Sequence, residues 1–169
     1  MKKLLFTAIM LWAGLSFGQR FAYIDTEYIL DNIPEFKAAE QELEQLSMTW
    51  QREIEEIFGE VDRLYREYQA EAPLLPEDMR RRREETIIER EREAKNLQMQ
   101  RFGREGDLFQ KRQELIKPIQ DRVFRAVEEL ATNENYAVIF DKAGSLTMIF
   151  TDVRFDLSDQ ILRNLGYRR

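Results

Sequence analysis

Two long segments with a coiled-coil-like repeat, joined by a proline-containing turn, constrain this chain more than any other feature. In the first segment apolar residues recur every three or four positions, which is the spacing of a helix that buries one stripe. The stripe consists of Leu43, Leu46, Trp50, Ile54, Ile57, Val61, Leu64 and Tyr68. Pro34 suits the first turn of this helix, and Pro73 and Pro76 end it, because proline lacks an amide hydrogen. A helix from about residue 35 to about 71 would be roughly 55 Å long.

The second segment predicts a helix from near Glu77 to about Thr132. Its last part carries another apolar stripe, formed by Leu115, Ile116, Ile119, Val123, Val127 and Leu130. Pro118 lies inside this stripe and is expected to bend the helix. The first segment is strongly acidic, whereas the second holds similar numbers of acidic and basic residues. The two segments are therefore expected to pair as an antiparallel hairpin.

Gly103 and Gly106 also fall within the second predicted helix, where each glycine is less favourable than alanine by roughly 1 kcal/mol. Antiparallel pairing about the turn would place them opposite Leu46 and Leu43. Two interpretations stay open: the glycines permit close helix packing, or they form a hinge that swings the arm.

The first 18 residues have the pattern of a secretory signal peptide. Lys2 and Lys3 precede an uncharged, largely apolar run, and small residues flank Phe17. The run is shorter than the roughly 20 apolar residues of a membrane span, although a retained anchor is the alternative. We expect cleavage between Gly18 and Gln19, and a soluble protein outside the cytoplasm.

Short segments typical of β-strands flank the helices. Phe21–Asp25 is one, and two more, Tyr136–Phe140 and Leu146–Phe150, surround Gly144 as in a β-hairpin. A final helix is expected after Asp156, ending at Gly166. The predicted class is α+β. A small β head is completed by oligomerisation, and a long helical hairpin is inserted between the first strand and a C-terminal β-hairpin with a short helix.

The predicted division of the chain separates a leader, a head and an arm. The leader is 1–18, the head combines 19–34 with 132–169, and the helical hairpin arm is 35–131 with its turn at 72–76. So small a head is marginally stable alone, and its strands carry bulky apolar residues on both faces. We therefore expect an oligomer. The expected interface residues are Tyr23, Ile24, Val138, Ile139 and Phe140.

Composition argues against catalysis and against nucleic-acid binding. The chain is 34% charged with a net charge of -6, and phosphate binding needs a basic surface. It has no histidine and no cysteine, so the commonest general base, thiolate chemistry, disulfides and the usual zinc ligands are missing. There is also no glycine-rich phosphate loop. We expect no catalytic residue, cofactor or metal, and a binding or holding role.

The two ends of the chain carry its most specific motifs. Residues 21–30 read FAYIDTEYIL and residues 34–39 read PEFKAA, while residues 135–141 read NYAVIFD and residues 155–162 read FDLSDQIL. This pattern resembles the Skp/OmpH family of periplasmic chaperones over essentially the whole chain after the leader. The resemblance implies a homotrimer with a β body and three helical arms, which enclose unfolded outer-membrane proteins without ATP.

One departure from that family concerns charge. Its best-known members are basic whereas this chain is acidic, so contact with a membrane or with lipopolysaccharide is left open. A structural alternative is an extracytoplasmic coiled-coil spacer or adaptor that binds one folded envelope partner. A small enzyme is a third class, which the missing motifs disfavour. A holdase is expected to suppress aggregation of unrelated unfolded chains, and a spacer is not.

Apolar side chains on the arm are candidates for holding client proteins, because methionine and aromatic residues adapt to many sequences. The candidates are Phe58, Tyr65, Met99 and Phe102. Near the turn, Arg80–Arg83 could meet anionic lipid headgroups or client carboxylates. The simpler interpretation is a solvated face with ion pairs one helical turn apart, such as Glu77 with Arg81.

Overall fold

A computed structural model describes residues 20–144 and 148–167 of the chain. Long helices combine with one two-stranded sheet, which confirms the predicted α+β class. The chain divides into two compact units. The helical unit is Ile33–Arg122, and the end unit joins Met1–Asn32 to Val123–Arg169.

Two sequence predictions fall where the structure is not described. The leader at 1–18, with Gly18 and Gln19 at its cleavage site, lies outside the described residues, as does the start of the segment 146–150. The arm limits at 35 and 131 stay a prediction. Helix α6 (Lys117–Asn133) runs past Arg122, the last residue of the helical unit.

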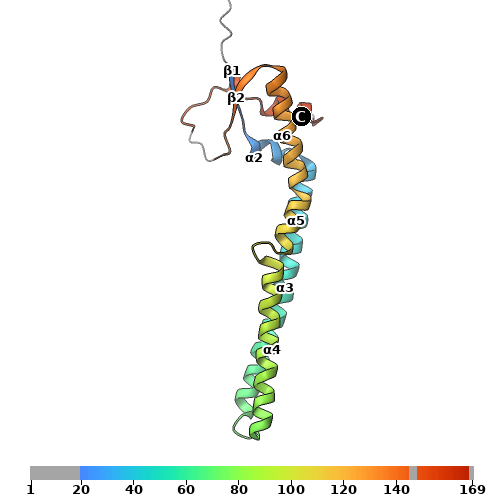
Figure 1. The fold of residues 1–169 in the computed structure, drawn as a ribbon, viewed down its shortest axis with the longest axis vertical. Helices are drawn as coiled ribbons and strands as arrows, with labels where there is room; N and C mark the ends of the chain where they lie inside the picture. The colour runs from blue at the N-terminus through green and yellow to red at the C-terminus, as the bar shows by residue number, and fades with distance from the viewer. Residues whose placement is uncertain (1–19, 145–147, 168–169) are drawn as a thin grey trace, which may run out of the picture. The chain divides into compact units, whose positions relative to one another are not determined.

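The helical unit is built around α3 (Pro34–Glu71), which lies beside α4 (Glu77–Phe102) and α5 (Asp107–Leu115) (Figure 1). Residues further along α3 contact residues nearer the start of α4. Trp50 contacts Phe102, Glu60 contacts Arg90, and Tyr68 contacts Glu84. The predicted antiparallel hairpin is therefore confirmed.

Prolines set the ends of these helices as the sequence predicts. Pro34 is the first residue of α3, where its missing amide hydrogen costs no helical bond. The turn after α3 is tight, with the amide of Leu74 donating to the carbonyl of Glu71 at 2.8 Å. Pro76 stands immediately before α4. Helix α3 ends at Glu71 and α4 begins at Glu77, so the chain reverses between these two residues.

The predicted seam of α3 is also confirmed, because each of its eight residues is buried or half-buried. Leu43 and Ile54 are the most buried of them. On α4 the matching position is Ala94, whose small side chain is fully buried. Most of the remaining surface of both helices is charged and exposed. One apolar stripe thus accounts for the pairing of the two helices.

The prediction of one continuous second helix is wrong, since it is divided into α4, α5 and α6. The first break spans Gly103–Gly106, and at both glycines the backbone is extended rather than helical. The amide of Gly103 still donates to the carbonyl of Met99 at 2.8 Å, so α4 ends there in an ordinary helical turn. Both glycines therefore lie between helices and not within one.

The second break lies at Ile116, next to the proline that was expected to bend the helix. Ile116 separates α5 from α6, and Pro118 occupies the first turn of α6. A proline in the first turn interrupts no hydrogen bond of its own helix, so a restart replaces the predicted bend. The predicted stripe around it is buried or half-buried throughout.

The end unit contains a parallel sheet of β1 (Arg20–Ile24) and β2 (Tyr136–Asp141). The pairing aligns Phe21 with Val138 and Tyr23 with Phe140. Parallel strands need a long connection, and here the helical unit supplies it. A sheet of two strands is marginal without support, so the helices of this unit have to cover it.

The predicted β-hairpin is not formed in the described residues. The segment Met148–Phe150 is not a strand, and residues 145–147 lie outside the description. In the described residues, the strand that pairs with β2 is β1. The pairing continues past the strand end, where the amide of Lys142 donates to the carbonyl of Ile24 at 2.7 Å.

The core of the end unit lies between short helices. It is formed by α2 (Thr26–Asp31) and α7 (Ser158–Asn164), which contact each other and bury Ile29 and Ile161 completely. The 3-10 helix η1 (Val153–Phe155) precedes α7 and contacts β1. The predicted stop of the last helix is confirmed, because Gly166 has a φ of 91° that favours glycine.

Candidate functional site

One face of the sheet carries aromatic side chains that the chain itself leaves partly uncovered. Because paired residues of neighbouring strands point to the same face, Phe21, Tyr23 and Phe140 lie on one side of the sheet. The segment before α7 adds Phe150 and Phe155 around the same cavity, of about 770 Å³. These five residues are called the aromatic face.

Large parts of this face are open to solvent. Phe150 is 84% exposed and Phe155 is 52% exposed, and Phe21 and Phe140 are exposed as well. Contiguous exposed apolar surface of this kind usually marks an interaction site in a soluble protein. Charged side chains stand at its edge, among them Arg20 and Asp152. The face therefore has the apolar centre and polar rim of a protein interface.

The five predicted interface residues are divided between the two sides of the sheet. Val138 and Phe140 are exposed and lie on the side of the aromatic face. Tyr23 and Ile24 are buried by their own chain, and Ile139 is half-buried beside Ala22. Sequence reasoning missed Phe21, Phe150 and Phe155. Period-two alternation from Tyr23 would have identified Phe21.

The motif residues at the two ends of the sequence form a polar cluster where both strands end. Asp141 accepts hydrogen bonds from the amide of Thr26 at 3.2 Å and from its hydroxyl at 2.7 Å. The amide of Asp25 donates to Ser158 Oγ at 2.9 Å, and the Asp25 carboxylate accepts from the amide of Tyr28 at 3.0 Å. These bonds join the ends of β1 and β2 to the starts of α2 and α7.

The polar cluster has the geometry of a structural joint. Asp156 accepts from both the amide and the hydroxyl of Ser158, at 2.9 and 2.6 Å, and Ser158 Oγ accepts from the amide of Asp25, so these polar groups are satisfied within the cluster. Among residues 20–144 and 148–167, no group of three or more carboxylates is placed to hold a metal ion. In that same part of the chain, no helix is both long and apolar enough to span a membrane.

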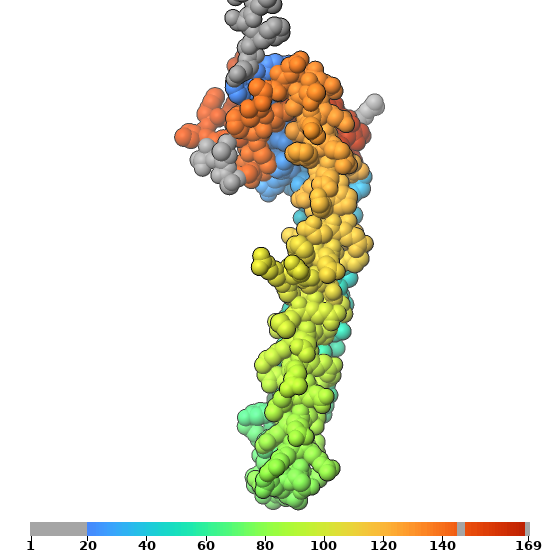
Figure 2. Space-filling view, viewed as in Figure 1, coloured from blue at the N-terminus to red at the C-terminus, as the bar shows by residue number. Residues whose placement is uncertain are grey.

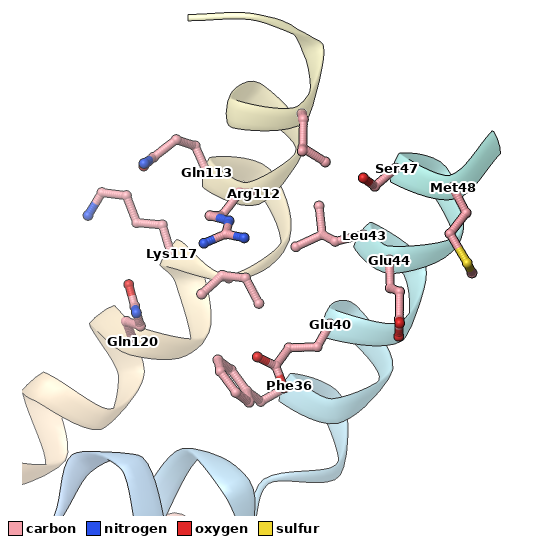
Figure 3. Close-up of a pocket in the computed structure, with 12 residues that line it drawn as sticks. Phe36, Glu40, Leu43, Glu44, Ser47, Met48, Arg112, Gln113, Lys117 and Gln120 are labelled. Carbon is pink, nitrogen blue, oxygen red and sulfur yellow. The ribbon is translucent and has the colours of Figure 1, made fainter. Parts of the chain in front are cut away.

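The helical unit has an opening between α3 and the α5–α6 segment, which we call the groove (Figure 3). Its volume is about 440 Å³. Leu43 from α3 and Ile116 from the facing segment form its floor, and Phe36 and Leu108 contribute further apolar surface. Polar and charged side chains surround this floor on both helices, as Figure 3 shows.

Arg101 ties the two sides of the Gly103–Gly106 break to α3. Its guanidinium donates to Asp107 at the start of α5 at 2.6 Å and lies 3.7 Å from Glu53 of α3. It also lies over the ring of Trp50, 4.9 Å from the ring centre, where a cation is attracted to the ring face. Figure 2 shows the connection between α4 and α5, in yellow, standing out from the surface of the helical unit.

Alanine at Gly103 is expected to destabilise the protein, although the same change in a regular helix stabilises. A Cβ atom at Gly103 would lie 2.3 Å from the carbonyl oxygen of Met99, and one at Gly106 would lie 2.6 Å from that of Gln100. These contacts are with backbone, so the chain would have to shift, at a cost of about 1–3 kcal/mol. Urea unfolding of Gly103→Ala measures the loss.

The matched control is Gly59→Ala in the middle of α3. A Cβ there meets nothing within 4 Å, so alanine is expected to stabilise by up to about 1 kcal/mol. Equal effects of the two variants would contradict the prediction. Antiparallel pairing suggested that methyl groups added at Gly103 and Gly106 would meet Leu46 and Leu43. The atoms nearest to these methyl groups belong instead to the backbone, at Met99 and Gln100. A hinge role for Gly103 and Gly106 stays a prediction.

The predicted client-binding residues differ in how much surface they offer. Met99 is 67% exposed, and Tyr65 is exposed as well. Phe58 is half-buried. Phe102 packs edge-on against Trp50, with ring centres 6.4 Å apart, so part of its surface is used within the arm. A further exposed apolar residue is Ile88 of α4, which follows the half-buried Ile87.

Two of the four arginines near the turn are held by ion pairs. Arg81 pairs with Glu77 one helical turn away, as the simpler interpretation predicts, and Arg83 lies 3.5 Å from Glu71 of α3. Glu84 accepts a hydrogen bond from the Tyr68 hydroxyl, and this bond raises the pKa of Tyr68. Ion pairing therefore accounts for two of these arginines, Arg81 and Arg83.

The fold defines a class of protein in which a long helical hairpin connects the two parallel strands of one small sheet. A family model described as "Outer membrane protein (OmpH-like)" matches residues 20–165. The chain therefore belongs to the OmpH-like family, which confirms the resemblance seen in its terminal motifs.

Two individual proteins illustrate this relationship. An uncharacterized protein of Aquifex aeolicus is 27% identical over 165 residues, covering 98% of this chain and 96% of that protein. A crystal structure from Caulobacter crescentus, described as a "putative outer membrane chaperone (OmpH-like)", matches with a TM-score of 0.69. The match covers 89% of this chain and 86% of that one at 10% identity, so it establishes likeness of fold.

Proposed function

We propose that this protein is an ATP-independent holdase chaperone, which binds unfolded outer-membrane proteins and prevents their aggregation. The observation that carries the proposal is the set of separate apolar side chains exposed on a charged helical surface, such as Tyr65, Ile88 and Met99. Many weak, scattered contacts suit a client that must stay unfolded and must leave without an energy source. The family membership and the description of the Caulobacter protein support the same role.

The working form in this proposal is a homotrimer. The aromatic face of each copy is covered by its neighbours, because a two-stranded sheet with exposed aromatic residues is marginal alone. The helical hairpins then extend as three arms around a shared space. Tyr23 and Ile24 support this interface from within each subunit, and Val138 and Phe140 contact the neighbour.

The site of action in this proposal is the periplasm, reached through cleavage of the leader between Gly18 and Gln19. The role is non-enzymatic and needs no cofactor. Clients are bound by shape-tolerant apolar contacts, so no nucleic acid and no catalytic step is involved. Contact with the membrane or with lipopolysaccharide is not required by the mechanism.

The test is suppression of aggregation. A β-barrel protein diluted from urea scatters light as it aggregates, and the mature trimer is expected to suppress that scattering without ATP at near-equal concentration. Replacing Tyr65 and Met99 together by serine is expected to raise the concentration needed severalfold, because exposed apolar contacts with the client are lost. The thermal midpoint should change little, since both side chains are exposed.

The matched control is Phe124→Ser, which removes an exposed aromatic side chain from α6 in the end unit. It is expected to leave suppression unchanged. A protein that binds one folded envelope partner and suppresses no aggregation would be a spacer or adaptor, and that result would overturn the proposal.

A further inference from the structure

The groove is an opening in the seam between α3 and the α5–α6 segment. Paired helices normally interdigitate their side chains at the density of an organic crystal. At the floor of this opening of about 440 Å³, Leu43 and Ile116 keep only 6% and 8% of their surface exposed. More apolar surface is open on the half-buried Phe36 and Leu108 and on the exposed Met48. The volume of the groove falls in the range of roughly 300–1,000 Å³ that is usual for binding pockets. The opening is therefore large enough to receive apolar side chains from another molecule.

The two walls of the groove carry opposite charge. Glu40 and Glu44 stand on α3, and Arg112 stands on α5. Figure 3 shows Glu40 and Arg112 on facing helices. Among the described residues, no ion pair joins Arg112 to Glu40 or Glu44, and the pair that links α6 to α3, Arg122 with Glu35, lies outside the groove lining. The charges are therefore available to a molecule that enters the groove.

This charge pattern selects among possible occupants. Lys117 also lines the groove, but its ammonium group is paired with Asp121 of its own helix. An anionic lipid headgroup or a nucleic-acid phosphate would be attracted chiefly by Arg112 and repelled by Glu40 and Glu44. A purely cationic ligand would meet the reverse conflict. A polypeptide segment with one basic and one acidic side chain satisfies both walls, and its apolar side chains can reach the floor. The geometry thus favours a peptide over a lipid.

We propose that the groove binds an extended segment of an unfolded polypeptide in which an apolar side chain is flanked by a basic and an acidic residue. The proposal rests on the holdase function and names one binding site for it. Strands of outer-membrane barrels alternate apolar and polar residues, so an extended segment presents its apolar side chains on one side. The apolar side chain packs on Phe36, Leu108 and Met48, above the floor formed by Leu43 and Ile116. The basic side chain meets Glu40 and Glu44, and the acidic one meets Arg112.

Two features of the chain make this site adaptable. Met48 stands exposed at the rim, and its flexible thioether side chain can pack against partners of different shape. Leu108 lines the groove from α5, which restarts immediately after the Gly103–Gly106 break. Because all the lining residues belong to the helical unit, one copy of the chain forms the complete site.

Fluorescence can test the site directly, because the chain has no cysteine. Met48→Cys places a single label at the rim, and Thr49→Cys places one on the next residue, which is exposed and does not line the groove. The probe is a short synthetic peptide of alternating leucine and polar residues that includes one lysine and one glutamate. Its binding is expected to change the emission of the label at position 48 and to leave the label at position 49 unchanged.

Two further variants distinguish binding in the groove from nonspecific binding of the peptide to the protein surface. Ser47→Phe fills the groove from α3 and is expected to weaken peptide binding at least tenfold, with the thermal midpoint recorded to verify folding. Glu40→Arg with Glu44→Arg is expected to weaken binding about three- to fivefold, since exposed charge contacts are modest. The same change in charge at positions off the groove, Glu55→Arg with Glu56→Arg, should have no effect.

The outcomes distinguish this proposal from the holdase function. The protein could suppress aggregation while the peptide leaves the emission of the label at position 48 unchanged and binds the Ser47→Phe variant normally. Those results would overturn the groove site but not the holdase function. Emission changes with anionic phospholipid vesicles but not with the peptide would overturn it in favour of a lipid site. Loss of peptide binding in folded Ser47→Phe, with normal binding in the Glu55 and Glu56 control, would support it.

Discussion

Phe140→Asp is expected to convert the proposed trimer into a folded monomer. Phe140 belongs to the aromatic face, and it is exposed in the single chain. In the proposed trimer a neighbouring subunit covers this side chain, so aspartate would place an unpaired carboxylate in an apolar interface. That substitution costs several kcal/mol for each subunit. Light scattering of the purified variant measures the mass, and circular dichroism verifies that the helices are retained.

The neighbouring residue gives the matched comparison. Ile139 pairs with Ala22, which is buried, on the opposite side of the sheet, so Ile139→Asp acts on the chain's own core. It is expected to unfold the end unit as well as to prevent assembly. Phe124→Asp, at an exposed aromatic residue away from the cavity, should leave the mass unchanged. An intact trimer of Phe140→Asp would show that the aromatic face is not the interface.

The helical hairpin was the part of the fold that sequence reasoning predicted best. A burial stripe repeated every three or four residues is a local pattern, and it depends only on helix geometry. The seam from Leu43 to Tyr68 and the proline-bounded turn could therefore be read directly. Tertiary packing did not alter them.

The break at Gly103–Gly106 was missed because single glycines are tolerated within helices. The sequence does carry a signal there, since the run from Gly103 to Asp107 contains two glycines and no apolar side chain. Such a run interrupts the apolar stripe of a helix. The conformation itself depends on contacts that no local pattern encodes, above all the link from Arg101 to Asp107 and Glu53.

The parallel sheet could not be predicted from local signals. Apolar segments on both sides of Gly144 favour a hairpin, whereas the actual partner of β2 is β1, on the far side of the helical unit in the sequence. Turn residues cannot indicate the pairing of two strands that lie so far apart in the sequence. The missing hairpin also explains part of the aromatic face. Phe150 was expected to lie in a strand paired with β2, and without that pairing it is exposed.

Asp141→Ala is expected to cause the largest loss of stability among single changes to the polar cluster. Asp141 accepts two hydrogen bonds from Thr26 and one from the amide of Ala143 at 3.0 Å. Bonds to a charged acceptor contribute roughly 1.5–3 kcal/mol each, and this carboxylate is half-buried, so a total loss of about 3 kcal/mol is expected. Urea unfolding at fixed protein concentration measures it.

Two variants show whether that loss comes from the joint between strand and helix. Asp141→Asn keeps one acceptor oxygen and is expected to lose about half as much as alanine. Asp152→Ala removes a carboxylate whose hydrogen bonds run to Arg154, two residues away, and whose pKa those bonds lower. The Asp152 side chain caps the short helix η1 but joins no separate elements, so Asp152→Ala should destabilise by about 1 kcal/mol or less. Equal losses for Asp141→Ala and Asp152→Ala would mean that the polar cluster does not hold β1, β2 and α2 together.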